Sequence, residues 1–280
     1  MHRLPLCLLS LFCFAGTAFT QAPDSLRTPP AAPEADSIRT VAATRAADSI
    51  PAAPARQAAD SLPPVFVPLA ADSLPATAAR SHEWQPLFGD SLADAAFDPA
   101  AWTLEKGVLA AWKDKPIWTK TEYENFELDL EFKTDNGTNS GVLVYCTDTG
   151  NWIPNAVEIQ IADDYSEKWS GAKPYEQCGA IYGHLAADRP QVVRKPGRWN
   201  HLRVRCRGKR IVVILNGKKV TEMNMARWTS GRQNPDGSAI PDWLPVPLAE
   251  MPAKGFVGLQ GKHGESGIWF KNLRIRSINQ

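Results

Sequence analysis

Residues 123–137 read YENFELDLEFKTDNG, and apolar and acidic side chains alternate through the centre of this stretch. The apolar residues take every second position: Phe126, Leu128, Leu130 and Phe132. The acidic residues fill the positions between them: Glu127, Asp129 and Glu131. Successive side chains of a β-strand point to opposite faces, so the pattern predicts a strand with one apolar and one polar face. Such strands are typical of antiparallel sheets that are solvated on one side.

The acidic face of this strand fits two interpretations. It resembles the E-x-D-x-E strand of laminarinase-type retaining glycosidases, in which two carboxyl groups about 5–5.5 Å apart act on the glycosidic bond. That strand usually has tryptophan and glycine before the first glutamate, whereas YENF precedes Glu127 here. The pattern therefore favours a solvated sheet face, and a retaining glycosidase that uses Glu127, Asp129 and Glu131 remains the alternative.

The rest of the C-terminal part of the chain repeats short β-patterned runs between turn residues. These runs are 107–112, 126–132, 141–146, 156–162, 201–208, 210–223, 255–262 and 268–278. Asn216-Gly217 inside one of them predicts a two-residue hairpin. No long helical period interrupts the pattern, so residues 81–280 are expected to form one all-β sandwich or barrel. The proline-rich segment 227–254, with Trp228 and Trp243, is expected to be a functional loop.

The N-terminal part has a different composition. Arg3 and an apolar run before small residues near position 20 predict a signal peptide at 1–20, and hence a secreted or periplasmic protein. Residues 21–80 are rich in Ala, Pro, Asp and Ser and repeat an Asp-Ser-Leu/Ile motif every twelve residues. Its aspartates are Asp24, Asp36, Asp48, Asp60 and Asp72. So few apolar side chains cannot offset chain entropy, which predicts a disordered spacer.

The net charge and the absence of common nucleotide-binding and hydrolase motifs disfavour several functions, and the cysteine count limits the disulfides. The formal net charge of +1 gives no reason to expect a nucleic-acid partner. No glycine-rich nucleotide motif, P-loop or G-x-S-x-G elbow is present. Cys146, Cys178 and Cys206 remain after the predicted cleavage, so at most one disulfide can form among them. Cys146 and Cys206 lie in strand-like runs and are expected to be buried thiols.

Residues 151–164 carry one candidate site. Val157, Ile159 and Ile161 form the apolar face of a predicted strand, which leaves Glu158 and Gln160 together on the other. If the preceding run pairs with this strand, Tyr145 would share that face. An acid, an amide and an aromatic ring suit sugar hydroxyls and the apolar face of a sugar. Asp163 follows at the end of the strand. The other interpretation is a plain solvated face.

Residues 258–270, GLQGKHGESGIWF, carry a second candidate site. Gln260 and Lys262 fall on one face of a predicted strand. His263 lies between Gly261 and Gly264, which suits a ring presented to a cleft, and an imidazole can act as acid or base near neutral pH. A lone histidine is more often structural, so the sequence leaves both interpretations open.

Taken in order, these blocks resemble the 3-keto-disaccharide hydrolase family. The resemblance rests on FELDLEFK, NSGVLVY, NAVEIQIADD, KPGRWNHLRVRCRGKRIVVILNGKKV, GFVGLQGKHG and IWFKNLRIR, and it covers about Trp84 to Ile278. It implies a concanavalin A-like jelly-roll sandwich of two antiparallel sheets. It also implies an exported glycoside hydrolase that acts on sugars already oxidised at C3 by a separate dehydrogenase.

The chemistry of such a substrate suggests roles for the candidate residues. A C3 ketone acidifies the C2 proton, so a base can remove it, the C1 substituent leaves by β-elimination and water adds. We assign the base to Glu158 and the acid to His263. Substrate contacts are expected from Gln160, Tyr145, Lys262, Gln260, Asp163, Trp228 and Trp243. The sequence points to no definite cofactor, although Glu158, Asp163 or His263 could hold Ca²⁺ or Mg²⁺. A carbohydrate-binding module without turnover is the rival function.

Overall fold

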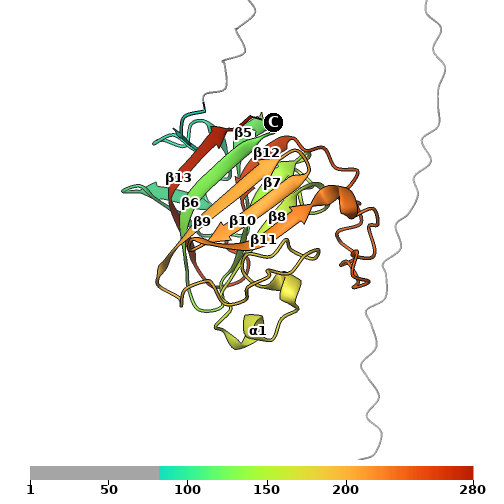
Figure 1. The fold of residues 1–280 in the computed structure, drawn as a ribbon. Helices are drawn as coiled ribbons and strands as arrows, with labels where there is room; N and C mark the ends of the chain where they lie inside the picture. Colours follow the sequence, from blue (N-terminus) through green and yellow to red (C-terminus); the bar gives the residue numbers. More distant parts are fainter. Residues whose placement is uncertain (1–81, 280) are drawn as a thin grey trace, which may run out of the picture. The chain divides into compact units, whose positions relative to one another are not determined.

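The computed structural model describes residues 82–279, which form two antiparallel sheets packed face to face (Figure 1). The larger sheet has the order β11 (Lys218–Asn224), β10 (Arg210–Leu215), β9 (Trp199–Arg207), β6 (Phe126–Thr134), β13 (Ile268–Ser277), β4 (Val108–Ala111) and β3 (Trp102–Glu105), and β1 (Gln85–Pro86) also pairs with β13. The smaller sheet has the order β2 (Ala95–Ala96), β5 (Ile117–Tyr123), β12 (Gly255–Leu259), β7 (Asn139–Cys146) and β8 (Val157–Ala162). This is the predicted jelly-roll sandwich of the concanavalin A-like type.

Helical structure in residues 82–279 is limited to single turns. They are α1 (Glu167–Ser170) and the 3₁₀ turns Ile153–Asn155, Pro174–Glu176 and Met225–Arg227. No helix in this range is long and apolar enough to cross a membrane. The predicted signal peptide and the predicted spacer, residues 1–80, lie outside the described residues.

The predicted strand runs are all strands in the structure, with ends shifted by at most three residues. Asn216 and Gly217 both have positive φ, 49° and 77°, which is the geometry of a tight type I′ hairpin between β10 and β11. The sequence analysis missed β5 (IWTKTEY), whose alternation is broken by the lysine and threonines at its centre. It also missed the short strands β1, β2 and β3.

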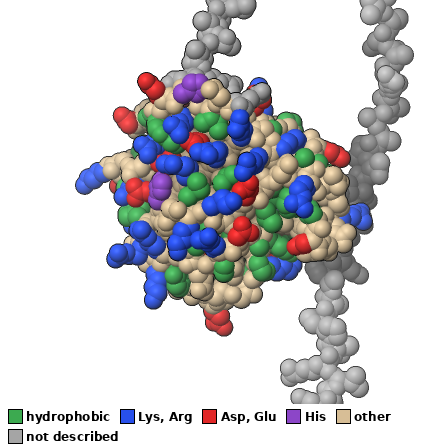
Figure 2. Space-filling view, viewed as in Figure 1, with side chains coloured by type: hydrophobic (Ala, Val, Ile, Leu, Met, Phe, Trp, Pro, Cys, Tyr) green, Lys and Arg blue, Asp and Glu red, His purple; other side chains and the backbone are tan. Residues whose placement is uncertain are grey.

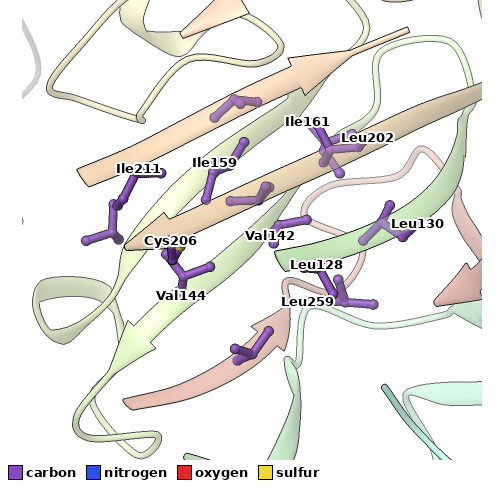
Figure 3. Close-up of a cluster of buried hydrophobic side chains, with 14 of the residues drawn as sticks. Leu128, Leu130, Val142, Val144, Ile159, Ile161, Leu202, Cys206, Ile211 and Leu259 are labelled. Atoms are coloured by element: carbon purple, nitrogen blue, oxygen red, sulfur yellow. The ribbon is translucent and has the colours of Figure 1, made fainter. Parts of the chain in front are cut away.

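The core fills the space between the two sheets. Leu128 and Leu130 of the larger sheet and Ile159 and Ile161 of the smaller one are each fully buried there (Figure 3). The apolar sides of β6 and β8 therefore face each other, as the alternation predicted. Consequently Glu127 and Glu158 point away from the core on opposite outer faces of the sandwich.

The acidic side of β6 faces outward, but it is not the solvated surface that the alternation suggested. Glu127 is 0% exposed and Asp129 only 3% exposed. Arginines from β9 and β13, on either side of β6, cover both carboxylates. Neighbouring strands place side chains directly opposite one another, so a central acidic strand between two basic strands buries its own charges.

The three cysteines of the described domain are free. Cys146, Cys178 and Cys206 are all buried, and no disulfide joins any two of them. The expectation of buried thiols at Cys146 and Cys206 is confirmed.

Candidate active site

A cavity of about 300 Å³ opens on the outer face of the smaller sheet. Strand residues form its floor and loop residues form its walls. Its lining residues are Asn139, Trp152, Ile153, Glu158, Gln160, Tyr182, Trp243, Leu244, Gln260 and His263. Five of the residues proposed from the sequence, Glu158, Gln160, Trp243, Gln260 and His263, are therefore brought together in one place.

The strand register explains how the floor is built. β7 lies between β8 and β12 in the smaller sheet, and Leu143 pairs with Glu158 while Gly141 pairs with Gln160. On the other side, the Gln260 amide donates to the carbonyl of Gly141. The floor thus combines Glu158 and Gln160 of β8 with Gln260, which follows β12. Gln260 lies 100 residues after Gln160 in the chain.

Glu158 is held in an environment that disfavours its charge. Burial in the cavity raises the pKa of this carboxyl to about 8, and repulsion from Asp114 adds to the effect. No salt-bridge partner for Glu158 is found among the described residues. A carboxyl of this kind is largely protonated at neutral pH. Because its pKa is close to neutral pH, it can both give up and take back a proton, as expected of an acid–base group.

His263 is paired with a second carboxylate at the mouth of the cavity. Its Nδ1 lies 2.6 Å from Oδ2 of Asp114, which comes from the turn between β4 and β5. Backbone bonds fix the segment, because the His263 amide donates to the carbonyl of Asn139 and the Lys262 amide to that of Lys113. A carboxylate only accepts hydrogen bonds, so Nδ1 carries the hydrogen of this bond, which leaves Nε2 as the ring nitrogen that can exchange a proton with a substrate.

The two glutamines of the floor carry unused acceptors. Oε1 of Gln160 and Oε1 of Gln260 are buried and have no hydrogen-bond partner within the described structure. The amide orientation of Gln160 is set by Nε2, which donates to Oδ1 of Asn139 and to the carbonyl of Glu176. Buried polar atoms without partners are costly, and in a cavity they indicate where the hydroxyl groups of a ligand bind.

Aromatic side chains line the walls. Trp243, in the long loop 227–254, is 55% exposed at the rim, whereas its neighbour Leu244 is buried. Tyr182 stands beside Glu158: burial and the Glu158 charge raise the pKa of its hydroxyl to about 12. An exposed indole next to buried amides is the combination that binds a sugar through its apolar face and its hydroxyls. The long loop therefore contributes Trp243 and Leu244 to the cavity wall.

Tyr145 was placed in this site by strand alternation, and that prediction is wrong. A β-bulge interrupts β7, because Leu143 pairs with Gly258 while Cys146 pairs with Phe256, and Tyr145 has a positive φ of 56°. The extra residue turns Tyr145 into the core between the sheets. Its hydroxyl donates to the carbonyls of Glu124 and Gly208, and its ring packs edge-on against Phe126.

Three other proposed residues also lie outside the cavity lining. Lys262 is directed toward Glu265, with 3.8 Å between the charged atoms. Asp163 accepts hydrogen bonds from the backbone amides of Gly137 and Tyr165 and so holds a loop. Trp228 is buried, and its indole donates to Asn234.

Of the three ligands proposed for a divalent cation, Glu158 and His263 line the cavity and Asp163 does not. Asp163 is committed to backbone amides, away from Glu158 and His263. Among residues 82–279, no group of three or more His, Cys, Asp or Glu side chains is placed to hold a metal ion. The donor set of the cavity is one carboxyl, one imidazole and several amides, which is poor in the hard anionic oxygens that Ca²⁺ and Mg²⁺ prefer.

The sequence analysis missed three residues that complete the site: Asp114, Asn139 and Tyr182. Asp114 lies in a lysine-rich turn, KDK, that gives no periodic signal, and it is 149 residues away from His263. Asn139 is the first residue of β7, on the face that also holds Gly141. The Tyr182 amide donates to the Glu158 carbonyl, an irregular connection that alternation cannot predict.

A family model described as a 3-keto-alpha-glucoside-1,2-lyase-like domain matches residues 83–276. The chain belongs to this family. The match covers both sheets and every residue of the cavity, so the family's domain and the described sandwich coincide. The resemblance noted in the sequence is confirmed.

Individual relatives of this 3-keto-glucoside lyase-like domain agree with that membership. A 3-keto-disaccharide hydrolase from Bacteroides thetaiotaomicron is 25% identical over an alignment of 177 residues, and the match covers 56% of this chain and 60% of that protein. The match therefore spans less than two thirds of that relative. A solved structure from Parabacteroides distasonis ATCC 8503, provisionally named a glycosyl hydrolase, is 67% identical with a TM-score of 0.69. It covers 70% of this chain and all of its own.

A second solved structure from the same organism, with the same provisional name, shares the fold. It is 23% identical with a TM-score of 0.58, and the match covers 71% of this chain and 95% of that one. The chain is thus a member of a glycosyl hydrolase-like family.

Proposed function

We propose that the protein cleaves 3-keto-glycosides by proton abstraction at C2, β-elimination of the C1 substituent and addition of water. The observation that carries the proposal is the cavity in which Glu158, with a pKa of about 8, and the His263–Asp114 pair lie with two unsatisfied amide oxygens. The name of the family, a 3-keto-glucoside lyase-like domain, supports this substrate class.

The reaction needs a base and an acid. The base takes the C2 proton, and the electrons of that bond form an enolate with the C3 carbonyl. The enolate then reforms the ketone as a C1–C2 double bond forms and the C1–O bond breaks, and the acid protonates the departing oxygen. Water adds at C1 and a proton returns to C2, so the net result is hydrolysis. The amide groups of Gln260 and Asn139 supply donors for the C3 oxygen.

The surroundings of the two titratable groups favour the reverse of the roles that we assigned from the sequence. Because Nδ1 of His263 is hydrogen-bonded to Asp114, Nε2 is the ring nitrogen that can accept a proton, and the carboxylate stabilises the imidazolium that forms, which suits the base at C2. Glu158 is largely protonated at neutral pH, which suits the acid that protonates the departing oxygen. In this assignment kcat/KM falls as pH rises through about 8, whereas Glu158 as the base would make it rise there.

The deciding experiment compares a chromogenic 3-keto-glucoside with its unoxidised parent. We expect release of the aglycone from the keto substrate alone and, in D₂O, one deuterium at C2 of the sugar product. The product incubated without enzyme controls for slow exchange. Binding of both sugars without release would support a carbohydrate-binding module instead.

Matched variants locate the reaction. Glu158→Gln should abolish turnover, whereas Glu131→Gln, a carboxyl on the opposite outer face, should leave it unchanged. The reverse result, with cleavage of an unmodified β-glucan, would support a retaining glycosidase on β6. Glu127 and Asp129 are poor candidates for that role, since each is paired with two arginines.

The proposal also places the protein in a sequence of reactions. A separate sugar 3-dehydrogenase must supply the ketone, because this mechanism has no route to C2 proton loss without it. The predicted signal peptide adds that the keto-glycoside is met outside the cytoplasm.

A further inference from the structure

The outer face of the larger sheet carries a dense array of cations that the proposed reaction does not use. Figure 2 shows lysine and arginine side chains spread over this face, which Figure 1 shows to be formed by β9, β10, β11 and β13 with β6 among them. The formal net charge of the whole chain is only +1, so an excess of cations at one place on this face is not a consequence of the overall charge.

One part of this face is hollowed. A groove of about 340 Å³ crosses β9, β10 and β11, with Val212 and Ile214 in its floor. We name it the cationic groove. Its charged residues are Arg205, Arg207, Arg210 and Lys219, together with the single carboxylate Glu222. Glu222 is shared by Arg210 and Lys219, so an excess of positive charge remains along the groove.

A buried acidic layer holds the arginines beside the groove in place. Glu127 binds Arg205 of β9 and Arg276 of β13 through the Nε and Nη2 atoms of each. Burial opposes the charge of Glu127, but the hydrogen bonds from Arg276 and Arg205 outweigh it and lower the pKa of this carboxyl. The carboxylate therefore stays charged, and it fixes guanidinium groups that would otherwise be mobile.

Trp84 fixes the other end of the array. Its ring lies under the guanidinium groups of Arg274 and Arg276, 4.8 and 4.6 Å from their carbons. Arg203 lies over the same ring at 5.8 Å. Cationic side chains that are already ordered lose little conformational entropy when they bind a ligand. The array is therefore a preorganised binding surface.

We propose that the cationic groove binds an acidic polysaccharide, a chain that bears uronate or sulfate groups. Rows of side chains on this face are about 5 Å apart across strands and about 7 Å apart along them, which suits an extended polymer with charges at regular intervals. The aliphatic floor offers contact to the apolar faces of sugar rings. Among the described residues, the large apolar side chains that are exposed are Trp112, Ile153, Tyr165 and Trp243, and none lies on β9, β10 or β11, which argues against insertion into a lipid surface.

The test measures binding of the full chain to immobilised polygalacturonate and dextran sulfate, with neutral dextran as the reference. We expect retention by both acidic polymers, none by dextran, and a loss of binding as salt rises from 50 to 500 mM. The double variant Arg207→Gln/Arg210→Gln should weaken binding about tenfold or more. Turnover of a 3-keto-glucoside should not change, because the cavity lies on the opposite sheet.

The matched control is Lys168→Gln/Lys173→Gln, which removes two exposed cations from the α1 region. An equal loss of binding in this control would overturn the proposal in favour of bulk charge. Equal retention by neutral dextran, or tighter binding to anionic phospholipid vesicles than to either polymer, would overturn it as well. Because no keto substrate is present, the result does not depend on whether the proposed reaction is correct.

Discussion

The α-carbon of Gly141 lies directly against the carboxyl group of Glu158. A methyl group at position 141 would come within 2.3 Å of Oε1 and 2.7 Å of Cγ of that side chain, closer than real Cβ atoms approach. The glycine on β7 therefore makes the space in which the glutamate of β8 lies against the sheet, and its absence of a side chain is part of the geometry of the site.

We predict that Gly141→Ala displaces Glu158 and lowers kcat/KM on a 3-keto-glucoside by about 100-fold. Overpacking at a buried position costs about 1–3 kcal/mol, so the variant should still fold. Gly89→Ala is the control, because a methyl group there meets Asp94 at an ordinary 3.5 Å. Wild-type activity in Gly141→Ala would contradict the placement of Glu158 in the reaction.

Glu158 should make the protein less stable as the pH rises. Its pKa is raised from 4.5 in the unfolded chain to about 8 in the folded one, so the folded state holds the proton more tightly. Stability from this group is fully present below pH 4.5 and is lost between pH 4.5 and about 8. Glu158→Gln removes this dependence, so its stability relative to the wild-type protein should increase from pH 4.5 to pH 8 by on the order of 4 kcal/mol. Urea unfolding of both proteins at the two pH values measures it.

Asp114 is predicted to act through His263. Asp114→Asn removes the carboxylate that orients the ring, and we expect kcat to fall about 10- to 100-fold with little change in KM. The pH profile should shift as well, which a purely structural residue would not cause. Asp90→Asn, another exposed aspartate, serves as the control. Unchanged kinetics and pH profile in Asp114→Asn would exclude a working His263–Asp114 pair.

The two tryptophans of the long loop should behave differently. Trp243 is exposed at the rim of the cavity, so Trp243→Ala should raise KM about tenfold and leave the melting temperature nearly unchanged. Trp228 is buried, so Trp228→Ala should destabilise the fold by about 3–5 kcal/mol. Thermal melts and kinetics of both variants decide the matter. A large loss of stability in Trp243→Ala would show that its role is in packing instead.

Removal of divalent cations should leave activity unchanged. Asp163, one of the ligands suggested by the sequence, is bound to the backbone amides of Gly137 and Tyr165 and does not face the cavity. We expect the same rate on a 3-keto-glucoside before and after dialysis against EDTA. A loss that Ca²⁺ or Mg²⁺ restores would show that a cation takes part.

The sequence was sufficient to predict the fold and the floor of the site. Alternation in a strand with one buried face assigns every side chain to a side, so Glu158 and Gln160 follow directly from the pattern of β8. The pairing of β7 with β8 was also predictable, because these strands are adjacent in the chain. Gln260 and His263 were found from their own strand and the glycines around the histidine.

Alternation failed where the backbone departs from regular geometry or where partners are distant. The bulge at Tyr145 adds one residue to β7, and the sequence GVLVYC contains no glycine or other turn residue at that point that would predict it. Tyr182 lines the cavity and Asp114 contacts His263, and both come from loops whose path depends on the whole sandwich. The outward carboxylates of β6 were expected to be solvated, since a single strand does not show that both neighbours, β9 and β13, carry arginines at the paired positions.

The protonated form of Glu158 changes the net charge of the protein at neutral pH. The formal net charge of +1 counts every glutamate as ionised. With a pKa of about 8, this side chain retains most of its proton at pH 7, so the ligand-free protein carries nearly one proton more than its composition implies. A sugar that fills the cavity excludes water from the same carboxyl and strengthens its hold on that proton. The charge of the protein in neutral solution is therefore linked to the occupancy of its cavity.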